Sequence, residues 1–193
     1  PKMKILPNKI YYGWWVVGAA SGAQFGNAAT AINILTIFVL PMSAEFGWSR
    51  TEVAAATSVG AILGAVLAPF SGLLIDRIGS RIILTVGASL VVCACLGLSY
   101  VSTLLGFYIA FTIARSAEQG LVQVGAAPVV AKWFLRYRGR AMSIIFFSSA
   151  AGMIVTAPLV QWIIVESGWR SAWIVLAANM FVLGVVPCLI FVR

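Results

Sequence analysis

The chain has 193 residues, of which 62% are hydrophobic and only 9% are charged, a balance far outside that of soluble globular domains. Most of its surface must therefore face lipid. The net charge of +8 resides in short clusters between apolar runs rather than along one soluble face, so we expect no nucleic-acid partner. The chain has no histidine, and its three cysteines lie inside apolar runs. We therefore expect no disulfide, no bound metal and no cofactor.

The apolar runs predict six transmembrane spans within a single domain, 1–193. A span needs roughly 20 apolar residues, and each run is long enough to cross a bilayer with some tilt. The first run is too long for the core of a signal peptide and should remain as a helix. The connectors are short, so consecutive helices should be antiparallel neighbours. The spans are expected at about 14–40, 51–75, 82–101, 104–131, 141–165 and 171–192.

The distribution of basic residues predicts the orientation, because Lys and Arg near span ends are retained in the cytoplasm. If the N-terminus is inside, the outside holds only Arg50 and Arg170. The cytoplasmic side then holds ten basic residues, namely Lys2, Lys4, Lys9, Arg77, Arg81, Lys132, Arg136, Arg138, Arg140 and Arg193. We therefore expect a multi-pass protein of the cell membrane with both termini in the cytoplasm.

A weak internal similarity links two of the outer connectors. EFGWSR at 45–50 and ESGWRSAW at 166–173 both place a Gly-Trp pair before a new helix. One interpretation is simple anchoring by tryptophan at the membrane interface. The other is a three-plus-three repeat of inverted topology, which is found in half of many secondary transporters.

The most specific motif closes the second span and forms the following turn, where residues 72–81 read GLLIDRIGSR. It resembles the loop signature of the major facilitator superfamily, G-x-L-a-D-r-x-G-r-r. Ser80 stands where an Arg is usual, and Ile75 replaces a small residue. The positions that match are Gly72, Leu74, Asp76, Arg77, Gly79 and Arg81.

The physical chemistry of this motif suits a conformational gate. Gly72 permits close approach of helices, Gly79 permits a tight turn, and Asp76 can cap a neighbouring helix N-terminus. In the family, this loop contacts the other half of the transporter in one state, so Asp76 would govern switching. The alternative is an ordinary cytoplasmic turn with retained positive charge, but the number of matches at the expected helix end favours the motif.

A second resemblance is to the branch of the monocarboxylate transporters and oxalate:formate antiporters. It rests on the aromatic entry to the first span at 11–15 and on three features around the fifth span, which are Lys132-Trp133-Phe134, the basic run 138–140 and the small pair Ala151-Gly152. The alternative is a generic basic loop with interfacial aromatic residues.

Small residues recur at every fourth position in two of the spans. They lie at Gly18, Gly22 and Gly26 in the first span, and at Gly60, Gly64, Ala68 and Gly72 in the second. Helices in lipid associate through such close backbone contacts. The stripes predict either a surface that rocks against a second half or static packing within one bundle.

Polar residues at membrane depth are the candidate substrate and proton pathway. Arg115 and Glu118 lie near the middle of the fourth span, where an unpaired charge is costly, so they must face an interior. Helical spacing places them broadly on one face with Gln119 and Gln123, while Gln24, Asn27 and Asn33 lie in the first span. The family usually has an Arg four residues before a Gly in its fourth helix, whereas Arg115 precedes Gly120 by five. A purely structural ion pair is the alternative.

These observations predict an all-α membrane bundle, half of a twelve-helix secondary transporter with alternating access. No residue requires an enzyme. By resemblance, the substrate would be a small organic anion such as a monocarboxylate, oxalate or formate, moved with protons or by exchange. Alternatives are a six-helix channel or a non-transporting subunit that pairs with another chain. The sequence begins without Met and stops directly after the sixth span, so we expect a fragment whose partner is a missing six-helix half or a separate subunit.

Overall fold

The computed structural model of the chain describes residues 12–134 and 137–192, but not the side chains of 131 and 132. Within this part every regular element is a helix, in agreement with the predicted all-α class. Five of the basic residues used to predict the orientation lie outside the described residues. These are Lys2, Lys4, Lys9, Arg136 and Arg193.

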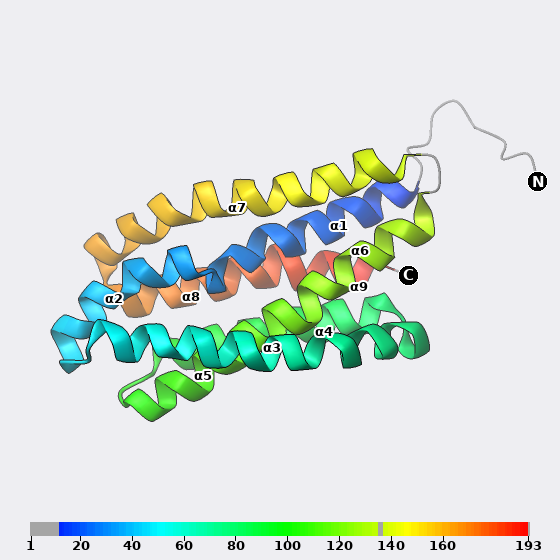
Figure 1. Cartoon of the computed structure of the whole chain (residues 1–193). Coiled ribbons are helices and arrows are strands. Elements are labelled where there is room, and N and C mark those ends of the chain that lie inside the picture. Colours follow the sequence, from blue (N-terminus) through cyan, green and yellow to red (C-terminus); the bar gives the residue numbers. More distant parts are fainter. Residues whose placement is uncertain (1–11, 135–136, 193) are drawn as a thin grey trace, which may run out of the picture.

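The described helices form six rods that run lengthwise beside one another (Figure 1). The first rod comprises α1 (Tyr12–Gly26), the short 3-10 turn η1 (Asn27–Thr30) and α2 (Ile32–Phe46). The second and third are α3 (Arg50–Ile78) and α4 (Ser80–Ser99). The fourth comprises α5 (Leu104–Ala117), the π turn η2 (Glu118–Val122) and α6 (Gln123–Trp133). The fifth is α7 (Arg138–Ser167), and the sixth comprises α8 (Trp169–Met180), the π turn η3 (Phe181–Val185) and α9 (Val186–Phe191).

The rods are long enough to cross a membrane, and five of them are also sufficiently apolar along their length. The fourth rod, 104–133, has a less apolar centre because Arg115, Glu118 and Gln119 lie there. Many large apolar side chains point away from the bundle, including Phe147, which is 74% exposed, and Val165, which is 72% exposed. A surface of this kind is stable only against lipid, so the chain is a multi-pass membrane protein.

Four of the six rods, namely the first, second, fourth and fifth, extend beyond the predicted spans. The first helix continues through Pro41 to Phe46, where a connector was predicted. A proline removes one backbone hydrogen bond, which a helix in a membrane tolerates when its neighbours support it. Two of the predicted connectors shrink to single glycines, Gly79 with φ of 89° and Gly168 with φ of 84°. Only glycine reaches such φ values without strain, so each allows the chain to reverse within one residue.

The packing of the rods has the pattern of a three-plus-three repeat. Helix α1 packs on α7, and α5 packs on α3, while α4 and α8 pack on each other. The sixth rod also lies against α1, as α4 lies against α5. If the first, second and third rods are matched with the fourth, fifth and sixth, the contact of α1 with α7 corresponds to that of α5 with α3. The contact of α4 with α8 then corresponds to itself. Consecutive halves with an odd number of spans have opposite directions in the membrane, so this is a repeat of inverted topology.

The two similar connectors contact each other and do not represent this repeat. The indole Nε1 of Trp169 donates a hydrogen bond of 2.6 Å to Glu45, and Arg170 lies 2.8 Å from the same carboxylate. The Phe46 ring packs on the edge of Trp169 at a centroid distance of 5.9 Å. Residues related by an inverted repeat would lie at opposite ends of the bundle. This cluster instead joins the first and sixth rods at one end.

The glycine stripes pack inside this bundle. A Cβ on Gly22 would lie 2.3 Å from the Leu183 carbonyl oxygen of η3, and a Cβ on Gly26 would lie 2.8 Å from Met180. The Gly22 separation in particular is too short for any other residue, so glycine allows the backbone of α1 to lie this close to the sixth rod. By contrast, Gly18 and Gly72 have no described atom within 4 Å of a Cβ position.

Candidate functional site

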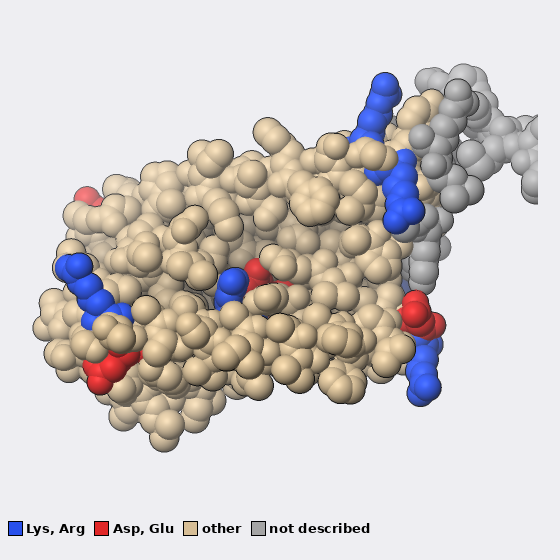
Figure 2. All heavy atoms as spheres, viewed as in Figure 1, with Lys and Arg blue, Asp and Glu red and all other residues tan. Residues whose placement is uncertain are grey.

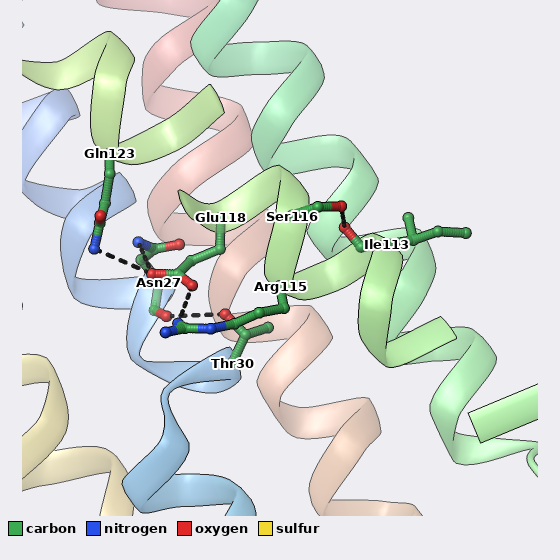
Figure 3. Close-up of polar contacts among 7 residues, drawn as sticks. All are labelled: Asn27, Thr30, Ile113, Arg115, Ser116, Glu118 and Gln123. Carbon is green, nitrogen blue, oxygen red and sulfur yellow. Dashed lines mark hydrogen bonds and ion pairs between the residues drawn. The ribbon is translucent and has the colours of Figure 1, made fainter. Parts of the chain in front are cut away.

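The first and fourth rods are both irregular at mid-length, and these irregular turns meet. Asn27 begins the 3-10 turn η1, and Glu118 begins the π turn η2. Asn27 Nδ2 donates a hydrogen bond of 3.2 Å to Glu118 Oε1 (Figure 3). The contact joins equivalent rods of the two repeats, so the site lies at the repeat interface near the middle of the bundle.

Glu118 is surrounded by three nitrogen donors. Its Oε1 accepts from Asn27 and from Gln123 Nε2, each at 3.2 Å, while its Oε2 forms an ion pair with Arg115. The side chain of Glu118 is only 5% exposed, whereas that of Arg115 is 15% exposed. A carboxylate at this depth is tolerated because an opposite charge and two amides compensate for its lost hydration.

The π turn decides which glutamine joins Glu118. In a regular α-helix, residues five apart point about 140° away from each other. Here the backbone N–H of Gln123 bonds to the carbonyl of Glu118, and this wider turn places the two residues one above the other. Gln119 is turned away toward α3, where its Cβ would lie 3.0 Å from a Cβ on Gly64. Gln119 keeps its regular spacing from Arg115, but its side chain lies against α3 and does not line the hollow.

These polar groups line a hollow of about 250 Å³. Figure 2 shows one basic and one acidic group in a recess midway along the bundle, while other charged side chains gather at its two ends. The first, fourth and fifth rods contribute its lining, which consists of Asn27, Ala28, Ala31, Ile32, Asn33, Arg115, Glu118, Gln123, Ser149 and Met153.

Two polar atoms of the hollow lack hydrogen-bond partners among the described residues. They are the acceptor Oδ1 of Asn27 and the donor Nε of Arg115. Buried polar groups are normally paired, so both atoms have unused hydrogen-bonding capacity beside the hollow. The guanidinium in particular offers a planar set of donors that matches a carboxylate. Chemically, the site can bind a small anion beside a carboxyl group that competes for the same cation.

The structure brings together five of the seven residues predicted for the pathway, and it leaves out Gln24 and Gln119. Gln24 is buried in α1 but does not line the hollow. Ser149 and Met153 of α7 were not predicted. The only sequence signal for them is the run of small residues at 148–152, which allows α7 to approach the first rod. A Cβ on Gly152 would lie 2.5 Å from the Phe25 carbonyl oxygen.

The predicted gate motif lies at the opposite end from the Glu45 cluster. Asp76 and Arg77 are exposed in the last turn of α3, and Gly79 forms the turn to α4. Arg81 Nη2 donates to the backbone carbonyl of Leu189 at 2.5 Å and so joins the third rod to the sixth. No described helix approaches Gly72 closely, so the described bundle does not show the close helix contact that was predicted for this glycine.

Metal and disulfide chemistry find no support in the described part of the chain. It contains no group of three or more His, Cys, Asp or Glu side chains that could hold a metal ion. Cys93 is exposed, while Cys95 and Cys188 are buried, and all three are free thiols. Among the buried polar side chains of the described residues, Glu118 is the only charged one, and it lines the hollow described above.

Comparison with known proteins agrees with this arrangement. Residues 20–193 match the family description Major Facilitator Superfamily. The chain belongs to this superfamily. Among its relatives, Monocarboxylate transporter 11 of Mus musculus is 25% identical over 177 residues, which are 91% of this chain and 39% of the relative.

Two further relatives give the same picture. Monocarboxylate transporter 1 of Homo sapiens is 24% identical over 168 residues, 85% of this chain and 33% of the relative. The uncharacterized MFS-type transporter YcxA of Bacillus subtilis (strain 168) is 25% identical over 160 residues, 82% of this chain and 39% of the relative. The chain thus spans less than half the length of the curated relatives that it matches, while membership in a transporter family agrees with a bundle that surrounds a polar hollow.

Proposed function

We propose that this chain forms one half of a secondary active transporter for a small organic anion, with the hollow as its half of the substrate site. The observation that carries the proposal is the Arg115–Glu118 ion pair at the repeat interface. Charges at this depth are costly, and transporters use them for substrates and coupling ions. The resemblance to monocarboxylate transporters supports a carboxylate as the substrate, and the guanidinium of Arg115 would bind it.

Glu118 would couple this binding to protons. Its carboxylate occupies one edge of Arg115, while the Nε of the same guanidinium has no partner among the described residues. A substrate carboxylate that takes Arg115 removes the cation that compensates Glu118, while the amides of Asn27 and Gln123 still donate to its carboxylate. Protonation of Glu118 would remove this conflict between two anions, so anion and proton would travel together, or one anion would exchange for another.

Alternating access would need a second six-helix half facing the hollow, supplied by a longer chain or by a separate subunit. The motif at Gly72, Asp76, Arg77, Gly79 and Arg81 would form the gate on the cytoplasmic side. We propose the cell membrane as the location, with both termini in the cytoplasm. The described basic residues support this orientation, because Arg77, Arg81, Arg138 and Arg140 lie at one end of the bundle and Arg50 and Arg170 at the other.

The test is uptake of radiolabelled lactate by proteoliposomes that contain the intact protein, with unlabelled formate and oxalate as competitors. Arg115→Lys keeps the charge but loses the planar donors. Loss of one charged hydrogen bond, roughly 1.5–3 kcal/mol, should raise the half-saturation concentration about tenfold or more. Glu118→Gln should preserve exchange of anion for anion but abolish accumulation driven by a proton gradient.

The matched control is the exposed ion pair of Glu45 and Arg170, because Glu45→Gln with Arg170→Gln removes the same charges far from the hollow. This control should transport as the unmodified protein does. The rival is a structural pair in a channel or in a non-transporting subunit. If Arg115→Gln combined with Glu118→Gln transported anions uphill at the normal rate, the pair would have no role in transport.

A further inference from the structure

Helix α3 crosses the fourth rod at two glycines that have different neighbours. A Cβ on Gly60 would lie 2.6 Å from Cβ and 2.9 Å from Cγ of Arg115. Carbon atoms do not approach each other this closely without repulsion. The backbone of α3 can therefore lie at this distance from Arg115 only because residue 60 has no side chain.

This contact acts on the base of the Arg115 side chain, while the guanidinium at the far end reaches Glu118 and the hollow. An arginine side chain can adopt many rotamers, and most of them must be excluded before its guanidinium is held in one place. The backbone of α3 blocks the space beside Cβ and Cγ, so the side chain must extend away from α3. That direction leads to Glu118.

We propose that Gly60 is a positioning residue for the anion site, because it lets α3 lie against Arg115 and direct its guanidinium into the hollow. The inference rests on the proposed role of Arg115 in anion binding. Gly60 contacts no substrate itself. Its effect passes through Arg115, so a change at residue 60 should alter anion affinity as well as helix packing.

The chain offers two matched controls. Gly64 lies one turn further along the same face of α3, and a Cβ there would lie 3.0 Å from Cβ of Gln119, which does not line the hollow. Gly64→Ala therefore perturbs the same helix crossing without moving the site. Gly18→Ala adds a methyl group where no described atom lies within 4 Å, and it controls for the change from glycine to alanine.

The first experiment measures lactate uptake by the intact protein in proteoliposomes, normalised to folded protein. Gly60→Ala should raise the half-saturation concentration about tenfold, because displacement of a binding group by a fraction of an ångström weakens its contacts strongly. Gly64→Ala and Gly18→Ala should leave it within about twofold. Equal half-saturation concentrations for Gly60→Ala and Gly64→Ala would overturn the proposal.

The second experiment does not depend on transport, so it separates a failure of this inference from a failure of the proposed function. In an Arg115→Gly, Glu118→Gln background, Cβ and Cγ of residue 115 and the buried charges are gone. Gly60→Ala should then reduce the folded yield no more than Gly18→Ala does, even if Gly60→Ala alone prevents folding. A loss of yield as large as in the otherwise unmodified protein would show that Gly60 acts elsewhere and would overturn the inference.

Discussion

Removing one partner of the Arg115–Glu118 pair should destabilise the bundle unequally, depending on which partner is removed. Breaking a buried ion pair typically costs about 3–5 kcal/mol, because the remaining charge has lost its compensation. In Arg115→Gln the remaining charge is Glu118, which is 5% exposed and retains two amide donors at 3.2 Å. We expect a loss of about 3 kcal/mol, near the low end of that range, because those two hydrogen bonds persist.

Glu118→Gln should cost less. The remaining charge is then Arg115, which is 15% exposed and lies at the edge of the hollow, where water can reach it. We expect a loss of about 1–2 kcal/mol. The double variant leaves no buried charge without a partner. Its loss of unfolding free energy should therefore be well below the sum of the losses in the two single variants.

The assay is the free energy of unfolding of the purified intact protein, measured by thermal and denaturant unfolding in one detergent. All variants are compared with the exposed pair Glu45→Gln and Arg170→Gln, whose effects should be small and additive. Equal costs for the two single variants would refute the reasoning from unequal exposure. Strict additivity in the double variant would show that the two charges do not depend on each other.

Three other predictions follow from the fold. After replacement of the native cysteines, a cysteine at Ser167 should react with an impermeant thiol reagent from outside and one at Tyr137 should not; the reverse pattern would invert the proposed orientation. Trp173→Ala should cost about 3–5 kcal/mol of stability by denaturant unfolding, because the indole is fully buried and stacked on a neighbouring ring at a centroid distance of 4.2 Å. The control is Trp162→Ala, which should cost far less because the Trp162 side chain is 64% exposed. Asp76→Asn should slow transport more than it weakens lactate binding, and an unchanged transport rate would reduce the motif to a topology signal.

The class of the protein could be predicted from the sequence because lipid imposes simple requirements. A bilayer allows few structures apart from apolar helices, so the lengths of the apolar runs determine the number of spans. Gly79 could be predicted as a turn because it ends one apolar run and precedes another. Arg115 and Glu118 could be identified as site candidates for the same reason, because a charge within an apolar run needs a partner or a polar interior.

The composition of the site depended on backbone geometry that has no clear sequence signal. The π turn at Glu118–Val122 brings Gln123 to Glu118, whereas regular helical spacing would point these two residues away from each other. A helix adopts such a turn when tertiary contacts compensate for its poorer hydrogen bonds, and those contacts come from other rods.

Tertiary packing also decided which small residues matter. Gly60 and Gly18 belong to similar stripes in the sequence, yet Gly60 meets Arg115 across a helix crossing, whereas a Cβ on Gly18 would have no described atom of another helix within 4 Å. Ser149 enters the hollow from α7 because that helix lies against the first rod. Local sequence therefore determined which helices form and which charges must be buried. Only the relative placement of the rods decided which side chains of different rods meet, because those contacts join residues far apart in the chain.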